Sequence, residues 1–554
     1  MSSPGEDPQA SGTEGVCRQR RCPPWRSCAF LAVLVLVLSA ANLAWLKADT
    51  RPPSWDPAGH AIATIRLSRV PLLPDPLQAV QQWFTQAEYP PLVYWLSAPL
   101  AHLFWPSADT FAGIHALFLA ILLLATYGLA RSMGGTGAGL LAACVVGLYP
   151  ILYGLERHYL LDFPLTAMVA LSNWLLIRSE GFRERRTAIA YGASLGLGML
   201  TKWPFALFVA GPFLVTVAFR VGRERAGWTN ILWASGTGFL VAAPWYIANF
   251  RSTIAFAATQ SAWAQAEGDP LLGSIVLLKY YALALVEQQI LLPFAVLALL
   301  GLLVVVTRRG LRHDTLFLLS WIALPYLYFT FAANKDPRFT VPYLTALAIF
   351  SALGLAWLKP RAIRAALTAL IALYALLQFS GLSWGLSQRL PSGVLPPRVG
   401  IHVGSHLLPV YSEVVHMASP AAPEDWQEQA MLHDLLATMS PQNGTRHAVL
   451  SVLANAEFFE PNAFTYYALA ERLPVDVLYL PDPFRSHGAR EKLAKSDYVI
   501  TKTGDLGPAW TTKETSELTR ELLTPLSELG SQFELVGGYP LPDGSEGRLY
   551  RRVQ

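Results

Sequence analysis

Two chemical kinds of ionisable side chain flank the apolar segments of this sequence. The carboxylates and their polar neighbours are Asp56, Glu88, Tyr89, His158 and Asp162. The cations are Arg157, Lys202, Lys335 and Arg338. A carboxylate can accept a proton from an attacking hydroxyl or amine, and cations can stabilise the negative charge that develops on a departing phosphate. A phosphate joined to a lipid would lie at this depth with its tail among apolar helices, so these residues favour group transfer from a lipid-linked phosphate.

Several of these residues also have a structural interpretation. Asp56 precedes a proline, and Asp followed by Pro is a favourable start of a helix. Arg157 and Asp162 are close enough in sequence to form an ion pair at a turn. Lys202 and Lys335 can extend their ammonium groups to lipid headgroups. These alternatives stay open, and for Asp56 capping and catalysis are compatible.

A metal site is not predicted. His158 and Asp162 are four residues apart and would share a helix face if their segment were helical. Two ligands do not make a metal site, so no cofactor is expected, although a divalent metal near the phosphate is compatible with the sequence.

Long apolar runs must position these side chains. The chain has 554 residues, a mean hydropathy of +0.35 and only 14% charged residues, whereas a soluble domain carries about a quarter. Its net charge of +4 does not indicate a nucleic-acid partner. Because a spanning helix needs about 20 mostly apolar residues, we expect about eleven transmembrane helices. They cover roughly residues 29–46, 110–129, 138–153, 163–177, 187–200, 203–219, 228–247, 290–306, 315–331, 339–358 and 362–384.

Basic residues in the short loops give the orientation, because loops rich in Lys and Arg stay in the cytoplasm. With the N-terminus inside, every inner loop is basic. These loops contain Arg131, Arg178, Arg183, Arg185, Arg186, Arg220, Arg223, Arg225, Arg308, Arg309, Arg312, Lys359, Arg361 and Arg364. An odd number of spans then places the residues with candidate chemistry, and the C-terminal segment, outside the cytoplasm.

The chain divides into three parts. Residues 1–28 are expected to be a disordered cytoplasmic tail, and residues 29–385 a transmembrane catalytic domain with outer loops at 47–109 and 248–289. Residues 386–554 are expected to form an extracytoplasmic α/β domain, because strand-like runs at 447–453, 475–479, 498–501 and 548–553 alternate with helix-like runs at 463–472 and 513–529.

Six motifs, taken in order, give the sequence a family resemblance. They are Asp56 after the first span, the Pro-Pro-Leu…Tyr-Trp-Leu stretch at 90–96, Arg157 before Leu161-Asp162-Phe163-Pro164, the Gly-x-Gly-x-Leu-Thr-Lys segment at 196–202, Pro-Trp-Tyr at 244–246, and Lys-x-Pro-Arg-Phe at 335–339. With these marks the sequence resembles the polyprenyl-phosphate-sugar-dependent glycosyltransferases of the GT-C fold. The likeness is greatest to family 39, which includes protein O-mannosyltransferases and lipid A aminoarabinose transferases, and it covers roughly residues 29–384.

The resemblance implies an inverting glycosyltransferase with a polytopic α-helical fold. The donor would be a sugar linked to a polyprenyl monophosphate, and the acceptor a lipid, glycan or protein outside the cytoplasm. By the same resemblance, Asp56 is the catalytic base, Asp162 positions the acceptor or the base, and Arg157 and Lys202 face the donor phosphate. Lys335 and Arg338 are also expected to bind the donor phosphate, and Glu88, Tyr89 and His158 are expected to line the acceptor side of the cavity. A bacterial inner membrane is expected, because the loops are short and no retention signal ends the sequence.

The sequence also departs from the family pattern. Many relatives have a second acidic residue directly after the first-loop Asp, where this sequence has Pro57. Aminoarabinose transferases tend to have Glu-Lys before the double proline, where this sequence has Glu88-Tyr89. The alternatives are a membrane transporter or lipid flippase and a non-catalytic scaffold. A transporter usually places its charges near the midplane in repeated halves, and a scaffold would leave the outer charges unexplained.

Overall fold

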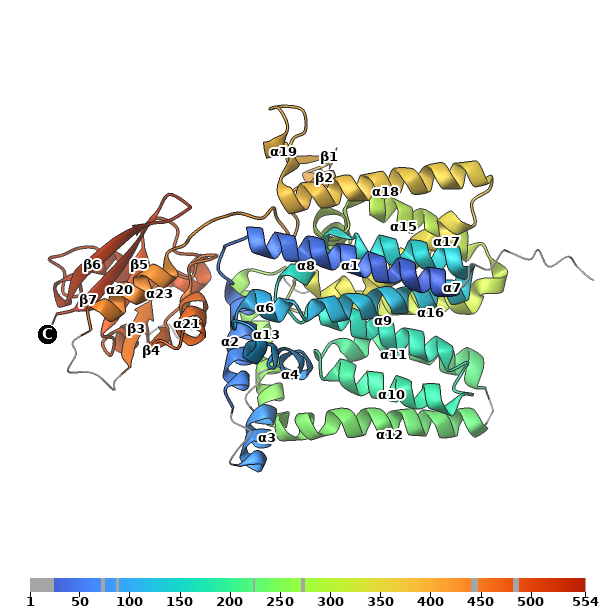
Figure 1. Ribbon diagram of the computed structural model, residues 1–554, viewed down its shortest axis with the longest axis horizontal. Helices are drawn as coiled ribbons and strands as arrows, with labels where there is room; N and C mark the ends of the chain where they lie inside the picture. The colour runs from blue at the N-terminus through green and yellow to red at the C-terminus, as the bar shows by residue number, and fades with distance from the viewer. Residues whose placement is uncertain are drawn as a thin grey trace, which may run out of the picture.

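The computed structural model describes residues 24–70, 75–85, 89–222, 225–270, 275–439, 447–481 and 488–553. Glu88, Arg223 and the predicted tail up to residue 23 lie outside the described residues. The described chain forms a bundle of helices with a smaller α/β unit at one end (Figure 1).

Each of the eleven predicted apolar segments coincides with helical structure. The helices are α1 (Pro24–Ala48), α7 (His115–Gly147), α8 (Pro150–Arg157), α9 (Asp162–Arg178), α10 (Arg185–Met199), α11 (Phe205–Thr216), η1 (Val217–Val221), α12 (Arg225–Ala248), α15 (Leu291–Val306), η3 (Arg309–Leu311), α16 (Arg312–Phe331), η4 (Pro337–Tyr343), α17 (Leu344–Ala356) and α18 (Arg361–Trp384). The second predicted segment and the first part of the third lie in α7, which is divided at Gly135 (φ +82°), and the third segment ends in α8. Glycine adopts this left-handed conformation at low cost.

Not all of these helices are long. Within the described ranges, six helices are long and apolar enough to cross a membrane, or seven if α8 and α9, bent by 119° at their junction, make one span. Helices α11 with η1 and α15 are apolar but shorter. The protein is therefore a polytopic membrane protein.

Further helices, most of them short, lie toward the end of the bundle that carries the α/β unit. They are α2 (Trp55–Ser68), α3 (Pro76–Thr85), α4 (Leu92–Ser97), α5 (Leu100–Leu103), α6 (Ala108–Ala112), α13 (Phe250–Glu267), α14 (Ile275–Ala284) and η2 (Leu285–Gln289). The apolar stretch near residues 92–104, predicted to lie in the membrane interface, forms α4 and α5.

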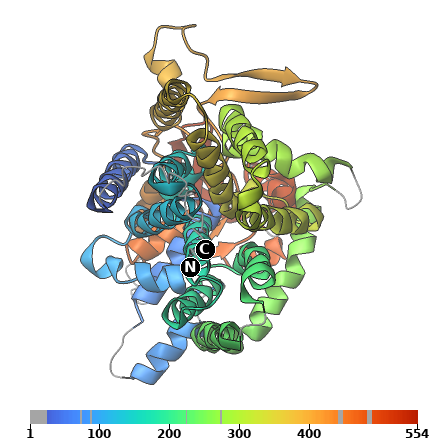
Figure 2. The same cartoon turned by 90° about the vertical axis from the view of Figure 1, so that its right-hand side faces the viewer.

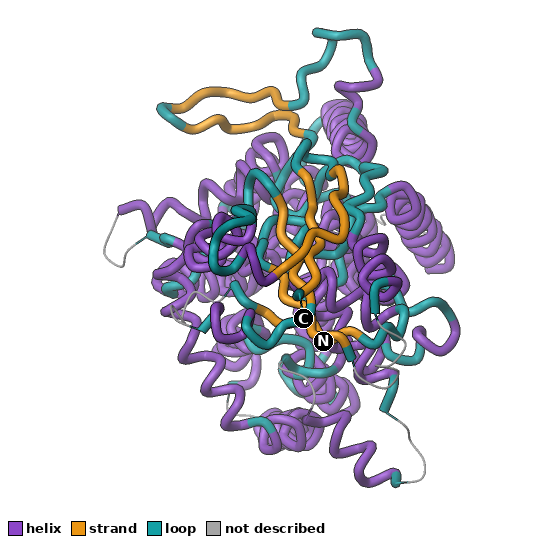
Figure 3. The backbone as a smooth tube through the Cα atoms, turned by 90° about the vertical axis from the view of Figure 1, so that its left-hand side faces the viewer, coloured by secondary structure: helices purple, strands orange, loops and turns teal. Residues whose placement is uncertain are grey.

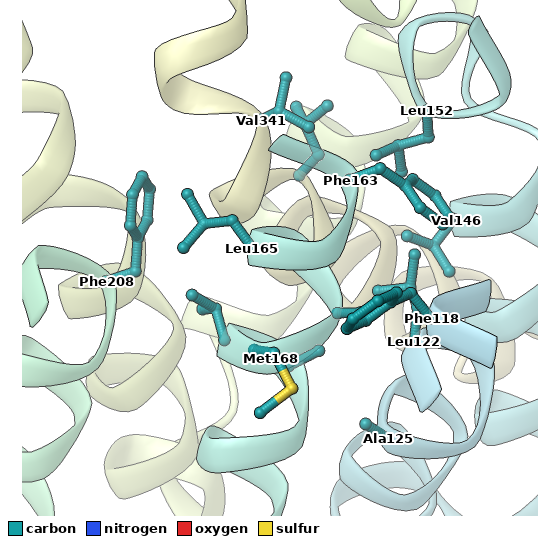
Figure 4. Packing of buried hydrophobic residues seen from close by; sticks show 14 of the residues in the cluster. Phe118, Leu122, Ala125, Val146, Leu152, Phe163, Leu165, Met168, Phe208 and Val341 are labelled. Carbon is teal, nitrogen blue, oxygen red and sulfur yellow. The ribbon is translucent and has the colours of Figure 1, made fainter. Parts of the chain in front are cut away.

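The core of the bundle surrounds α9. Phe163, Leu165 and Met168 of α9 are buried and point toward α7, α11 and η4, where Phe118 and Phe208 lie (Figure 4). Burying a large apolar side chain contributes about 1.5–3 kcal/mol. The first residue of α9 is Asp162, so the central helix fixes the position of this carboxylate.

The C-terminal unit is a five-stranded sheet between two helical layers. Its strands are β3 (Ala448–Val452), β4 (Val475–Tyr479), β5 (Tyr498–Lys502), β6 (Phe533–Pro540) and β7 (Glu546–Arg552), in the order β4-β3-β5-β7-β6. Strand β3 pairs parallel with β4 and β5, and β7 pairs antiparallel with β5 and β6. Its helices are α20 (Glu428–Ala437), α21 (Pro461–Ala470), α22 (Ala489–Leu493), α23 (Ala509–Leu522) and η6 (Gly530–Gln532). Helices α20 and α21 pack on one face of the sheet, and α22 and α23 on the other.

The segment between the bundle and the sheet packs on the bundle. It contains α19 (Leu386–Arg389) and a hairpin of β1 (Arg398–Val403) and β2 (His406–Ser412), which lies apart from the five-stranded sheet (Figures 1 and 3). Gln378 Nε2 of α18 donates to the carbonyl of Ser412 at 2.6 Å. Residues 386–425 therefore link the two parts through contacts with the spanning helices.

The two ends of the bundle differ in charge. At the end opposite the sheet, which faces the viewer in Figure 2, basic loops meet: Arg220 Nη2 lies 3.2 Å from His313 Nδ1, and Arg220 contacts Gly181. The other end carries α2, α13 and the sheet (Figure 1), and Asp56 lies there because it belongs to α2. This separation agrees with the expected orientation.

Candidate functional site

Asp56 is the second residue of α2, and its carboxylate does not cap this helix. The N-cap of α2 is Ser54, which makes no side-chain capping bond. The Asp56 carboxylate instead accepts a hydrogen bond from Arg338 Nη1 at 3.0 Å. The interpretation of Asp56 as the N-cap is therefore wrong. The Asp56 side chain is 51% exposed, so its carboxylate can meet a bound molecule.

Arg338 is held by a second carboxylate, that of Asp336. The backbone N–H, Nε and Nη2 of Arg338 lie 2.7, 2.8 and 2.7 Å from the Asp336 oxygens. His416 Nε2, from the segment after β2, lies 3.1 Å from Asp336. Burial raises the pKa of Asp336, but Arg338 and His416 outweigh it and hold that pKa far below its usual value. Asp336 thus orients Arg338 toward Asp56.

Asp162 forms a buried ion pair with Lys202. Lys202 Nζ lies 2.7 Å from Asp162 Oδ1, and the exposed fractions of the two side chains are 17% and 3%. The pair joins the start of α9 to the loop between α10 and α11. The hypothesis of an Arg157–Asp162 ion pair is therefore wrong, and so is the headgroup interpretation of Lys202.

His60 belongs with these residues, although sequence reasoning did not single it out. It follows Asp56 by four residues on α2, which places both side chains on one face of the helix. Its Nδ1 lies 2.7 Å from the Tyr94 hydroxyl, and its ring packs edge-on against Tyr89. Burial lowers the pKa of His60 to about 4, with Asp56 opposing the shift, so the imidazole is neutral near pH 7.

The two ion pairs are electrostatic neighbours. Arg338, with smaller contributions from His60 and Lys202, holds the pKa of Asp56 below its usual value. We call this group the outer ion cluster: Asp56, His60, Asp162, Lys202, Asp336 and Arg338. A cluster of carboxylates and cations in which Asp56 is open can bind an anion and accept a proton.

Tyr89 lies beside the outer ion cluster. Its ring stacks on Trp203, with centroids 5.8 Å apart, and packs edge-on against Phe256 of α13 at 5.2 Å. These aromatic rings border the cluster on the side of α4 and α13, where apolar surface can contact a sugar ring or a lipid.

Arg157 has different partners. Its Nε donates to Asn42 at 2.9 Å, its Nη2 donates to Ser383 at 2.7 Å, and its guanidinium lies over the rings of Trp45 and Tyr153. It is only 3% exposed. Its described contacts join α1, α8 and α18, and they include no member of the outer ion cluster.

Lys335 is also engaged elsewhere. Its Nζ donates to the carbonyls of Phe329, at 2.7 Å, and Thr330, at 3.0 Å, and it contacts the carbonyl of Ala332. These carbonyls end α16, where a cation is favoured. Lys335 is 5% exposed, so the headgroup interpretation is wrong for it.

His158 and Asp162 do not share a helix. Helix α8 ends at Arg157, α9 begins at Asp162, and the two axes differ by 119°. The His158 ring instead packs edge-on against Trp45. In the described part of the chain, no group of three or more His, Cys, Asp or Glu side chains is arranged to hold a metal ion.

The sequence has relatives among enzymes that use lipid-linked sugars. Residues 88–247 match the family described as dolichyl-phosphate-mannose-protein mannosyltransferase. Two curated relatives, from Aeromonas salmonicida and Aeromonas hydrophila, are undecaprenyl phosphate-alpha-4-amino-4-deoxy-L-arabinose arabinosyl transferases and are each 28% identical. Each match covers 48% of this chain and 49% of the relative, so the chain spans about half the length of these relatives.

Solved structures share the fold over nearly all of this chain. ArnT from Cupriavidus metallidurans bound to undecaprenyl phosphate matches with a TM-score of 0.61 and 15% identity over 95% of this chain and 98% of that chain. The apo oligosaccharyltransferase of Archaeoglobus fulgidus matches with a TM-score of 0.58 and 12% identity over 96% of this chain and 75% of that chain. At these identities the likeness establishes the fold.

Proposed function

We propose that this chain moves a sugar from a polyprenyl monophosphate to an acceptor outside the cytoplasm. The chain has the GT-C fold and is related to the dolichyl-phosphate-mannose-protein mannosyltransferases and the arabinosyl transferases. One observation carries the proposal: the half-exposed carboxylate of Asp56 lies 3.0 Å from the guanidinium of Arg338 at the outer end of the bundle. The base and the cation that this reaction needs are therefore in contact.

The chemistry is a single displacement with inversion. Asp56 takes the proton of the acceptor hydroxyl or amine. The acceptor atom forms a bond to the anomeric carbon as the bond between that carbon and the phosphate oxygen breaks, and the electron pair leaves with polyprenyl phosphate. Arg338 and Lys202 stabilise the charge on that phosphate through hydrogen bonds between ionised groups.

Donor binding changes the partners of Asp56. In the structure Arg338 is shared between Asp56 and Asp336, and Lys202 is paired with Asp162. A donor phosphate that takes the Nη1 of Arg338 removes a favourable partner from Asp56. The pKa of Asp56 then rises from its depressed value, which makes the carboxylate a better base when donor is present.

The proposed donor site differs from the one that the motifs imply. Arg338 and Lys202 are retained, because they belong to the outer ion cluster. Arg157 and Lys335 are left out, since the hydrogen bonds of their side chains go to other parts of the bundle and include no member of the outer ion cluster. Asp162 affects the donor indirectly, because its carboxylate binds and positions the ammonium group of Lys202.

We infer that the donor is an undecaprenyl-phosphate-linked sugar, which the names of the curated relatives support, and that the protein lies in a bacterial inner membrane. The N-terminus would be cytoplasmic and the α/β domain extracytoplasmic. The sugar is left open, because Tyr89 stands where aminoarabinose transferases tend to have a lysine.

Transfer from a panel of donors tests the proposal. The purified protein would be incubated with undecaprenyl-phosphate-linked sugars and a membrane extract as acceptor source, and free undecaprenyl phosphate would be measured. We expect release with at least one donor and its loss in Asp56→Asn. Equal release by the parent and by Asp56→Asn with every active donor would contradict the proposal.

A further inference from the structure

The N-terminus of α2, which carries Asp56, is tied to the α/β unit by one buried carboxylate. Glu460 Oε1 accepts the backbone N–H of Trp55 at 3.0 Å. The same oxygen accepts the N–H of Ala463 at 2.9 Å, and Oε2 accepts the N–H of Asn462 at 2.7 Å. Glu460 therefore caps α21 and also binds the first amide of α2, although the two helices are far apart in sequence.

Trp55 adopts a conformation that its neighbours must maintain. Its φ is +48°, in the left-handed region that only a few per cent of non-glycine residues occupy. Such a conformation costs about 1–3 kcal/mol and persists when surrounding contacts hold it. Because Trp55 is adjacent to Asp56, its backbone sets the direction in which the Asp56 side chain leaves the chain.

The residues before Trp55 are tied to the C-terminal half as well. The N–H of Thr50 donates to the carbonyl of Ala422 at 3.1 Å, and the N–H of Ala422 donates to Asp49 Oδ1 at 2.9 Å. Arg51 Nη2 donates to the carbonyl of Pro420 at 3.1 Å. The chain from Asp49 to Arg51 is thus fixed by the segment that leads into the α/β unit.

Glu460 is enclosed, with no exposed surface. Burial raises its pKa to about 7, although the three N–H donors favour the ionised form. A carboxylate kept in such a place satisfies the orphan N–H groups of two helix ends at once.

We propose that Glu460 is a positioning residue of the transfer reaction, because its carboxylate holds the Trp55 backbone and so aims Asp56 at the reacting atoms. The inference rests on the proposed function, in which Asp56 is the base. It assigns the α/β unit a part in catalysis.

The first test compares turnover with donor binding. Glu460→Ala removes all three acceptor bonds, and we expect kcat to fall at least about 10-fold while the KM for the donor changes less than about twofold, since Arg338 and Lys202 stay in place. Glu460→Gln keeps an oxygen at the Oε1 position for Trp55 and Ala463, so it should recover most of kcat. Phe464→Ala removes a buried ring from α21 and is the matched control for a weakened α/β unit. It should lower thermal stability but leave the kcat of the folded enzyme within about twofold of the parent.

The second test asks whether the effect passes through Trp55. Trp55→Asn places there a residue that tolerates the left-handed conformation, whereas Trp55→Phe keeps the conformational cost. Adding Glu460→Ala should reduce kcat less in the Trp55→Asn variant than in the Trp55→Phe variant. Equal reductions in the two variants, or an unchanged kcat in Glu460→Ala, would overturn the assignment.

Hydrogen exchange separates this inference from the proposed function. The amide of Trp55 should exchange faster in Glu460→Ala than in the parent and in Phe464→Ala, whether or not a donor is turned over. If the parent transfers no sugar, the proposed function fails while faster exchange still supports the contact. If the parent is active and exchange at Trp55 is unchanged in Glu460→Ala, the positioning role is wrong.

Discussion

The buried pair of Asp162 and Lys202 allows a donor-binding role to be separated from a structural role. Lys202→Met removes the cation but keeps an apolar stem of similar length. It leaves the Asp162 carboxylate, which is 3% exposed, without its partner. Removing one partner of a buried ion pair costs about 3–5 kcal/mol, so Lys202→Met should be clearly less stable in detergent than the parent.

The same substitution should also weaken donor binding. A hydrogen bond to a charged group contributes about 1.5–3 kcal/mol, which corresponds to about 10- to 100-fold in donor affinity. The double variant Lys202→Met/Asp162→Asn removes the unpaired charge, and we expect it to recover most of the stability. It should not recover the affinity, because the phosphate still lacks its cation.

The assay is paired. Thermal unfolding reports stability, and equilibrium binding of a polyprenyl-phosphate sugar reports affinity, for the parent, the single variant and the double variant. If the double variant regains stability and binds donor as tightly as the parent, Lys202 serves only to neutralise Asp162 and the proposed donor site is wrong.

Three further predictions follow from the described contacts. Lys335→Met should lower thermal stability and leave donor affinity within about twofold, because Lys335 binds the carbonyls that end α16. A large loss of donor affinity without a loss of stability would refute this structural role. Because the pKa of His60 is lowered to about 4, the unfolded chain takes up a proton at a higher pH than the folded chain does. The stability of the folded protein should therefore fall as the pH drops from 6.5 to 4, and it should fall less in His60→Gln. Identical pH dependence of thermal unfolding in the parent and in His60→Gln would contradict the assignment. A chain that ends at residue 425 should keep a protease-resistant inserted core better than a chain that ends at residue 386. The reason is that Gln378 binds Ser412 and Arg51 binds Pro420, and the shorter chain loses both contacts. Equal proteolysis of the two chains would argue against this role of residues 386–425.

Much of the architecture could be predicted from local sequence signals. Apolar length located the helices of the bundle, and basic loops distinguished its two ends. Strands β3, β4, β5 and β7 coincide with the strand-like runs predicted at 447–453, 475–479, 498–501 and 548–553. Strand β6, with two glycines in its centre, and the hairpin of β1 and β2, which pairs outside the sheet, have weaker signals and were not predicted.

The partners of the charged residues could not be predicted in the same way. Arg157 and Asp162 are close in sequence, but the bend between α8 and α9 separates them and places Lys202 beside Asp162. Arg338 reaches Asp56 across 282 residues. The spacing of His60 from Asp56 was visible in the sequence, whereas the contact of Glu460 with Trp55 depends on how the two domains pack.

The central claim is that Asp56 is the base of a sugar transfer, and the rate of Asp56→Asn tests it most directly. Asn keeps the size of the side chain and an oxygen that can accept from Arg338, but it loses the negative charge and the ability to take a proton. The rate of single-turnover transfer at saturating donor should fall about 100-fold or more in Asp56→Asn, the scale of a general-base contribution. Asp162→Asn is the control, and a smaller fall is expected for it. A correctly inserted Asp56→Asn protein that transfers sugar at close to the parent rate would contradict the mechanism.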